Sequence, residues 1–258
     1  IDAVGGMSFQ KYNRTYGSST GQQLPSDSYK KVFSAASITA GDSQETEWAL
    51  VSYFARANYK FKDKYLVGLS GRADGSSRFG ANNQYGFFPA ASVGWIISEE
   101  SFLTDNSIIE FLKVRGSYGL TGNSEIGNYD AFSLYTGQGY AGLPGQRPLQ
   151  IANPDLRWEQ TAQTDIGIDF GILNSRISGQ LDYYIKQTSD LLLNVNLPGT
   201  TGVARTQTRN VGDLENKGFE IVINTENLVG DFKWSTSFNF ARNENKITNL
   251  GDQVIEGS

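Results

Sequence analysis

The strongest constraint on the fold of this 258-residue chain is an alternation of apolar and polar residues over segments of about ten residues. In residues 112–120, the clearest segment, leucine, valine and tyrosine alternate with lysine, arginine and serine. Successive side chains of a β-strand point to opposite faces, so this segment predicts a strand with one apolar and one polar face. Strands of this length and pattern are what a transmembrane β-barrel requires.

Nine segments carry the pattern, which predicts an all-β fold of eight to nine antiparallel strands. The segments are residues 3–10 (the weakest), 48–59, 65–74, 89–97, 112–120, 164–170, 177–186, 219–225 and 234–243. Hydrophobic residues make up only 38% of the chain, which is low for a soluble globular domain. That share suffices where only the lipid-facing side of each strand must be apolar.

The connections between these segments alternate between short and long. Residues 61–64, 173–175 and 227–231 are predicted tight turns, because Asp, Asn and Gly stand where turn geometry favours them. The predicted long connections are residues 10–47, 75–87, 121–159 and 187–217, and residues 98–110 form an intermediate one with a helical turn. An up-and-down meander would place the long loops together at one end, which in outer-membrane barrels is the extracellular end.

Composition excludes several classes of function. The chain has no histidine and no cysteine, so Ser–His–Asp and Cys–His catalysis and Cys/His zinc sites are ruled out. A formal net charge of −5 argues against a nucleic-acid partner. There is no run of 18 apolar residues, as a transmembrane helix would need. We therefore expect no enzyme activity, no metal and no cofactor.

The alternative from the pattern alone is a soluble or surface-attached β-sandwich that binds glycans through its long loops, because sandwiches also contain short alternating strands. Loops of about 30 to 40 residues are uncommon in such compact domains. Charged residues also recur on the polar faces of the segments, which suits a water-filled lumen. Both observations favour the barrel.

Several stretches resemble the barrel of the SusC/RagA family of TonB-dependent outer-membrane transporters from Bacteroidetes. They are RADGSSRFG at residues 72–80 with YGFFP at 85–89, LKVRGSYG at 112–119 with TGN at 121–123, NPDLRWE at 153–159, NVG at 210–212 and NKGFE at 216–220. They follow one another in order through nearly the whole chain. A chance match to one stretch is plausible, whereas five in order identify the family.

The resemblance implies a large receptor with an N-terminal plug inside a barrel of about 22 strands. It also implies a SusD-like lipoprotein lid, energy from TonB and the proton-motive force, and import of glycan or peptide oligomers across a Gram-negative outer membrane. Residues 1–258 would then be a partial barrel domain without the plug, the first strands or the closing C-terminal strand. Such a piece would leave two unpaired sheet edges. A passive porin, needing no TonB, is a weaker alternative.

The resemblance and the residues name a few candidate substrate contacts. Arg72, Asp74 and Arg78 bridge a strand end and a Gly/Ser-rich loop, where they either meet substrate or tie the loop to the wall. Aromatic residues of the long loops are candidates for stacking on a sugar, with packing inside the loops as the alternative. The three that we single out are Tyr129, Tyr135 and Tyr140.

Three other features have plainer interpretations. Residues 137–142 match G-x-G-x-x-G, but Pro144 follows, so we expect a flexible loop and not a nucleotide site. Carboxylates on the polar faces are expected to hydrate and to pair across the lumen wall, and not to act as an acid–base pair. They are Asp165, Asp169 and Asp182, the last with Lys186 on its face. Aromatic residues near strand ends predict a girdle at the lipid boundary: Tyr59, Phe61, Tyr65, Trp95 and Trp234.

Overall fold

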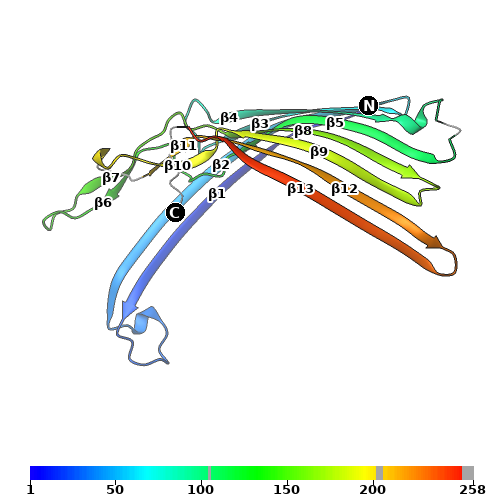
Figure 1. Ribbon diagram of the computed structural model, residues 1–258. Coiled ribbons are helices and arrows are strands. Elements are labelled where there is room, and N and C mark those ends of the chain that lie inside the picture. The colour runs from blue at the N-terminus through cyan, green and yellow to red at the C-terminus, as the bar shows by residue number, and fades with distance from the viewer. Residues whose placement is uncertain (104–105, 202–205, 252–258) are drawn as a thin grey trace.

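The computed structural model describes residues 1–103, 106–201 and 206–251, and its main feature is one curved antiparallel sheet of nine strands (Figure 1). The strand order is β1-β2-β3-β4-β5-β8-β9-β12-β13, so consecutive long strands are also neighbours. The strands are β1 Asp2–Gln22, β2 Ser37–Phe61, β3 Tyr65–Ser76, β4 Tyr85–Ile96, β5 Ile109–Asn123, β8 Glu159–Ile172, β9 Ile177–Ser189, β12 Asp213–Val229 and β13 Lys233–Asn249. Each of the nine alternating segments coincides with one of them, which confirms the predicted all-β meander.

The two kinds of connection lie at opposite ends of the sheet, as predicted. The tight turns after β2, β8 and β12 lie at one end, and the long loops lie at the other (Figure 1). The turn between β2 and β3 has positive φ at Lys62 and Asp63 (50° and 58°), the backbone of a type I′ hairpin turn. The expected helical turn between β4 and β5 is the short 3-10 helix Ile97–Glu99; residues 104–105 of that connection lie outside the described residues.

One prediction was wrong: residues 10–47 are mostly strand and not a long connection. β1 and β2 pair continuously from Asp2 opposite Asn58 to Gln22 opposite Ser37, which leaves a loop of residues 23–36. The outer half of this hairpin projects away from the other strands (Figure 1). Both faces of this part are exposed, so its sequence shows no alternation of apolar and polar residues. Hydrogen bonds between the two strands hold it together.

Two long loops also contain small hairpins that the sequence pattern missed. β6 (Leu134–Gly137) pairs with β7 (Gln146–Gln150), and β10 (Leu192–Asn196) pairs with β11 (Thr206–Asn210). Strands of four or five residues are too short to show a period. Within the described residues, no helix has the length and apolar composition needed to cross a membrane.

The nine-stranded sheet has one apolar face and one polar face. Large apolar side chains such as Leu69, Val93 and Ile166 are more than half exposed on the apolar face. In the part of the chain that the structure describes, the other two sheets are two-stranded hairpins in the loops, too small to cover the long strands as a β-sandwich requires. Among the strands that the structure describes, β1 and β13 have one neighbour each, so this sheet is an open arc with two free edges.

Candidate functional site: the polar face and its loops

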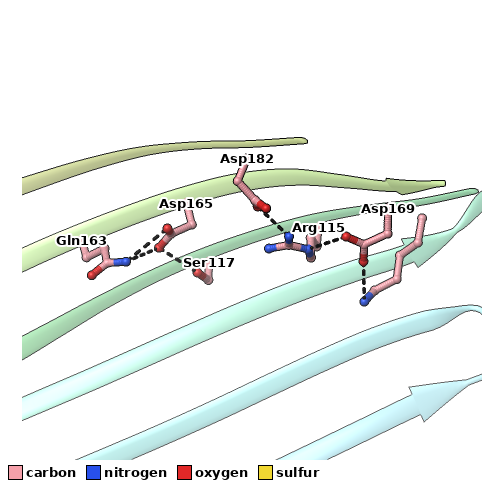
Figure 2. Close-up of polar contacts among 7 residues, drawn as sticks. Arg115, Ser117, Gln163, Asp165, Asp169 and Asp182 are labelled. Atoms are coloured by element: carbon pink, nitrogen blue, oxygen red, sulfur yellow. Dashed lines mark hydrogen bonds and ion pairs between the residues drawn. The ribbon is translucent and has the colours of Figure 1, made fainter. Parts of the chain in front are cut away.

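The centre of the polar face carries a ladder of ion pairs on β5, β8 and β9 (Figure 2). Lys113 Nζ lies 3.2 Å from Asp169 Oδ2, and Arg115 Nε lies 3.1 Å from Asp169 Oδ1. Arg115 Nη2 also lies 2.6 Å from Asp182 Oδ1. The prediction that these carboxylates pair across the wall is therefore confirmed for Asp169 and Asp182. Lys186, on the face of Asp182, lies instead over the Tyr184 ring, 5.2 Å from its centroid.

Arg115 reaches β9 because the residue between it and Asp182 is a glycine. Gly167 of β8 is opposite Arg115 on one side and opposite Asp182 on the other. A Cβ atom at Gly167 would lie 2.6 Å from the guanidinium carbon of Arg115 and would also collide with the Asp182 carboxylate. The missing side chain is thus a condition for the ion pair.

Asp165 differs from the other two carboxylates because neutral groups hold it. Gln163 Nε2 donates to its two oxygens at 3.1 and 2.9 Å, and Ser117 Oγ donates at 3.5 Å (Figure 2). Among the described residues, no cation lies within ion-pair distance of Asp165. Within the described residues, its partners are therefore neutral donors.

Arg72 and Asp74 pair with each other at the loop end of β3, whereas Arg78, in the loop that follows, contacts the loop after β5. Arg72 Nε lies 2.7 Å from Asp74 Oδ1, and Arg72 Nη2 donates to the fully buried Ser52 Oγ at 2.8 Å. Arg78 Nη1 donates to the Ser124 carbonyl at 3.0 Å. These contacts support the structural interpretation of the three residues; contact with substrate stays a prediction.

A small hydrophobic core sits at the loop end of the polar face. Its fully buried members are Phe79 and Leu156, and Trp158 packs with its ring centroid 5.0 Å from that of Phe79. Trp158 Nε1 donates to the Gln84 carbonyl at 3.0 Å. A Cβ at Gly80 would run into the carbonyl of Pro154. Two of the stretches that resembled SusC/RagA, residues 72–80 and 153–159, are therefore packed on each other.

Asn210 joins the last loop to this core, and residue patterns alone did not single it out. Its Nδ2 donates to the carbonyls of Arg157 (2.7 Å) and Asp190 (3.0 Å), and its Oδ1 accepts from the Arg157 amide at 2.9 Å. Arg157 Nη2 lies 2.6 Å from Asp190 Oδ1, and this hydrogen bond raises the pKa of the guanidinium. The signal for Asn210 was its place in the NVG stretch.

The three loop tyrosines lie in different settings. Tyr129 accepts a hydrogen bond from the Glu47 amide at 2.9 Å and so ties its loop to the β1–β2 hairpin. Tyr135 and Tyr140 lie on the β6–β7 hairpin and are 66% and 83% exposed. Positive φ at Ala141 and Gly142 (49° and 79°) makes the tip of that hairpin a tight turn. Residues 137–142 therefore lack the strand–loop–helix setting of a nucleotide site.

Aromatic residues form a row on the apolar face at the end with the tight turns, where the sequence predicted a girdle. Successive centroids of Tyr59, Phe61, Tyr65 and Trp95 are 6.3, 6.3 and 6.4 Å apart. Trp234 lies at the same end, at the start of β13. Among the described residues, no group of three or more acidic side chains could hold a metal ion.

Glu100 ties the connection between β4 and β5 to residues at the ends of β3 and β4. Its carboxylate accepts hydrogen bonds from Lys64 Nζ (2.6 Å), Tyr65 Oη (2.5 Å) and Trp95 Nε1 (3.0 Å). These three donors, Lys64 first, lower the pKa of Glu100 to about 2. The carboxylate is therefore ionised over the whole ordinary pH range.

Comparison with known proteins gives consistent results. The family model described as TonB dependent receptor-like, beta-barrel matches residues 2–257. TonB-dependent receptor P39 of Formosa agariphila is 39% identical over 258 residues, covering 98% of this chain and 25% of the relative. TonB-dependent receptor SusC of Bacteroides thetaiotaomicron is 40% identical over 234 residues, covering 87% of this chain and 23% of SusC. The chain thus spans about a quarter of the length of the curated relatives that it matches.

Solved structures show the same likeness. The structure titled RagAB peptide transporter superposes with a TM-score of 0.90 at 30% identity, covering 98% of this chain and 28% of that one. The siderophore receptor PirA of Acinetobacter baumannii, at 16% identity and a TM-score of 0.53, shares the fold alone.

Proposed function

The chain belongs to the TonB-dependent receptor-like β-barrel family, and from that premise we propose that it forms an arc of the wall of an outer-membrane nutrient importer. The observation that carries the proposal is the two-faced sheet. One face exposes large apolar side chains and ends in a row of aromatic rings, as a lipid-facing wall does. The other face carries ion pairs and hydroxyl groups, which suit a water-filled lumen.

The wall contributes passage and gating, with no bond chemistry. On the lumen side, Lys113 and Arg115 are neutralised by Asp169 and Asp182, so this ladder stiffens the wall more than it attracts cargo. Residues 1–258 would be one part of a larger barrel, whose other strands would pair with the free edges of β1 and β13. The plug and the segment that contacts TonB would come from the rest of the receptor.

The loop end would face the cell exterior, where a SusD-like lipoprotein would cover it. The packed core of Phe79, Leu156 and Trp158 would hold the loops rigid where such a lipoprotein contacts them. Tyr135 and Tyr140 have the exposure that stacking on arriving cargo requires. The contacts of Arg72, Asp74, Arg78 and Tyr129 would hold the loops at the channel entrance in place. The cargo class would be oligosaccharide or peptide.

The test is energised uptake by the full-length receptor in its native host. Cells carrying the gene should take up a labelled nutrient from the medium, cells with the gene deleted should not, and a protonophore should abolish the difference. Uptake that continues with the protonophore would indicate a passive porin. A receptor recovered in the aqueous phase without detergent would contradict the membrane location.

A further inference from the structure

The β1–β2 hairpin leaves the sheet at residues 47–49 of β2 (Figure 1). The ladder between β2 and β3 ends where Leu50 is opposite Ser76. Among the described residues, residues 14–46 pair only within the hairpin, and we call them the arm. The contacts that the loops make with residues 47–49 therefore decide how the arm stands relative to the loops.

Two loops hold this segment by hydrogen bonds to its backbone. The Ala49 amide donates to Ser77 Oγ at 2.9 Å, and the Ser77 amide donates to the Ala49 carbonyl at 3.0 Å. The Glu47 amide donates to Tyr129 Oη at 2.9 Å. Alternate residues of a paired strand direct their N–H groups to the same side. The Tyr129 hydroxyl, from the connection between β5 and β8, thus stands where the next residue of a β3 ladder would accept.

Arg78 makes a third contact with the same segment through the side chain of Trp48. Its guanidinium carbon lies 4.8 Å from the centroid of the Trp48 ring, within the range of a cation–π interaction. The Trp48 ring is stacked on Tyr12 of β1, with centroids 5.9 Å apart and planes 20° from parallel. A loop, β2 and β1 each contribute one group to this stack at the base of the arm.

The same guanidinium binds the connection between β5 and β8. Arg78 Nε donates to Asn128 Oδ1 at 3.1 Å, and Nη1 donates to the Ser124 carbonyl at 3.0 Å. The exposed Glu125 carboxylate lies 3.5 Å from Nη1. This connection packs on the loop core through Ile126 and carries the β6–β7 hairpin. One largely buried side chain therefore joins the base of the arm to the loop that bears β6 and β7.

The arm should move as one body when these contacts open. The ladder between β1 and β2 continues along its whole length, whereas the base is held by one stacked ring and a few hydrogen bonds. A unit with many internal hydrogen bonds and few outside contacts opens at its boundary before it unfolds.

We propose that Arg78 and Tyr129 form a latch that couples the position of the arm to the connection between β5 and β8, so that displacement of that connection releases the arm. Arg78 is a positioning residue in this device, because it acts on the arm through Trp48. The inference goes beyond the proposed function, since it concerns the receptor's own conformations and holds for any cargo.

The test measures the distance between spin labels at Ser28→Cys on the arm and Gln187→Cys on β9, in the full-length receptor in detergent without other cysteines. The receptor with Arg78 and Trp48 intact should give one narrow distribution. Arg78→Gln should raise the population of other distances about 5-fold, as expected for loss of a cation–π contact and its hydrogen bonds. Arg176→Gln is the control: it removes an arginine at the tight-turn end, bound to backbone carbonyls, and should leave the distribution unchanged.

Two further variants test the coupling itself. Trp48→Ala should broaden the distribution as Arg78→Gln does, and the double variant should add nothing, because both changes remove the same contact. Since coupling is reciprocal, Trp48→Ala on the arm side should also speed amide hydrogen exchange in residues 124–130. Tyr129→Phe, which retains the ring and removes the hydroxyl, should broaden the distribution further in the Arg78→Gln receptor.

A distance distribution in Arg78→Gln identical to that of the wild type would overturn the inference. Additive effects of Arg78→Gln and Trp48→Ala would overturn it too, because the two residues would then act separately. So would unchanged exchange in residues 124–130 of Trp48→Ala, which would leave the arm uncoupled from the loop. Unchanged heat-resistant migration in gels confirms that the barrel of each variant is folded.

Discussion

Arg115 and Asp182 form an ion pair of 2.6 Å although their strands are not neighbours, because Gly167 on the strand between them leaves the space above its backbone open. The guanidinium also binds Asp169, so one arginine joins three strands of the wall. An arginine that holds two carboxylates in a partly buried row is a cross-brace. Its removal would leave Asp182 without its cation and Asp169 with Lys113 alone.

Gly167→Ala should break this brace. The new methyl group would displace the Arg115 side chain from Asp182, and we expect a loss of about 1–3 kcal/mol in the free energy of unfolding. The unfolding midpoint of the full-length receptor in detergent and urea measures it. Gly171→Ala on the same strand is the matched control, because its Cβ would meet its nearest neighbours at an ordinary 3.5 Å. Equal midpoints for the two variants would contradict the role of Gly167.

Gly80→Ala should loosen the loop core. Its Cβ would collide with the carbonyl of Pro154, so residues 77–84 and 153–158 would have to separate. We expect protease cleavage within residues 77–84 of the intact receptor to become several-fold faster, which corresponds to about 1 kcal/mol of local opening. Gly137→Ala, where no atom lies within 4 Å of the new Cβ, should leave the digestion pattern unchanged.

Glu100 should make the turn end of the sheet sensitive to strong acid. Its pKa is lowered to about 2 in the folded protein by Lys64, Tyr65 and Trp95. A lowered pKa stabilises the fold above the ordinary value of about 4.3, and the contribution is lost as the pH falls from there towards 2. The unfolding midpoint of the wild-type receptor should therefore exceed that of Glu100→Gln at pH 6, and the difference should vanish near pH 2. A difference that stays constant with pH would contradict the assignment.

The outer part of the β1–β2 hairpin should be dispensable for folding of the wall. Among the described residues, β1 and β2 pair only with each other from Arg14 to Thr46, and both faces are exposed there. Replacing residues 14–46 of the full-length receptor with an Asn-Gly turn should preserve heat-resistant migration and the unfolding midpoint. Deleting residues 153–158, which carry Leu156 and Trp158, is the contrasting variant and should abolish both.

Strand positions were predictable because burial on one face imposes a two-residue period on the sequence, as in residues 112–120. The outer half of the β1–β2 hairpin was not predictable in this way, since neither face is buried and its residues therefore show no period. The small hairpins β6–β7 and β10–β11 were missed because each strand has only four or five residues.

The side-chain contacts likewise divide into those that the local sequence pattern predicts and those that it does not. Pairing of Asp169 and Asp182 with cations was predictable from the shared polar face, whereas the choice of Arg115 as the common partner depends on the register that sets Gly167 between them. The hydrogen bonds between Asn210 and Arg157 join residues 53 positions apart, and no local sequence pattern predicts such a contact.

The sequence by itself determined the two-faced strands, their order and the ends at which long and short connections lie, because alternation and turn chemistry act between near neighbours along the chain. Only the tertiary structure decided which charges pair with one another. Register brings Arg115 to two carboxylates on two different strands, and it places Asp165 beside Gln163 and Ser117.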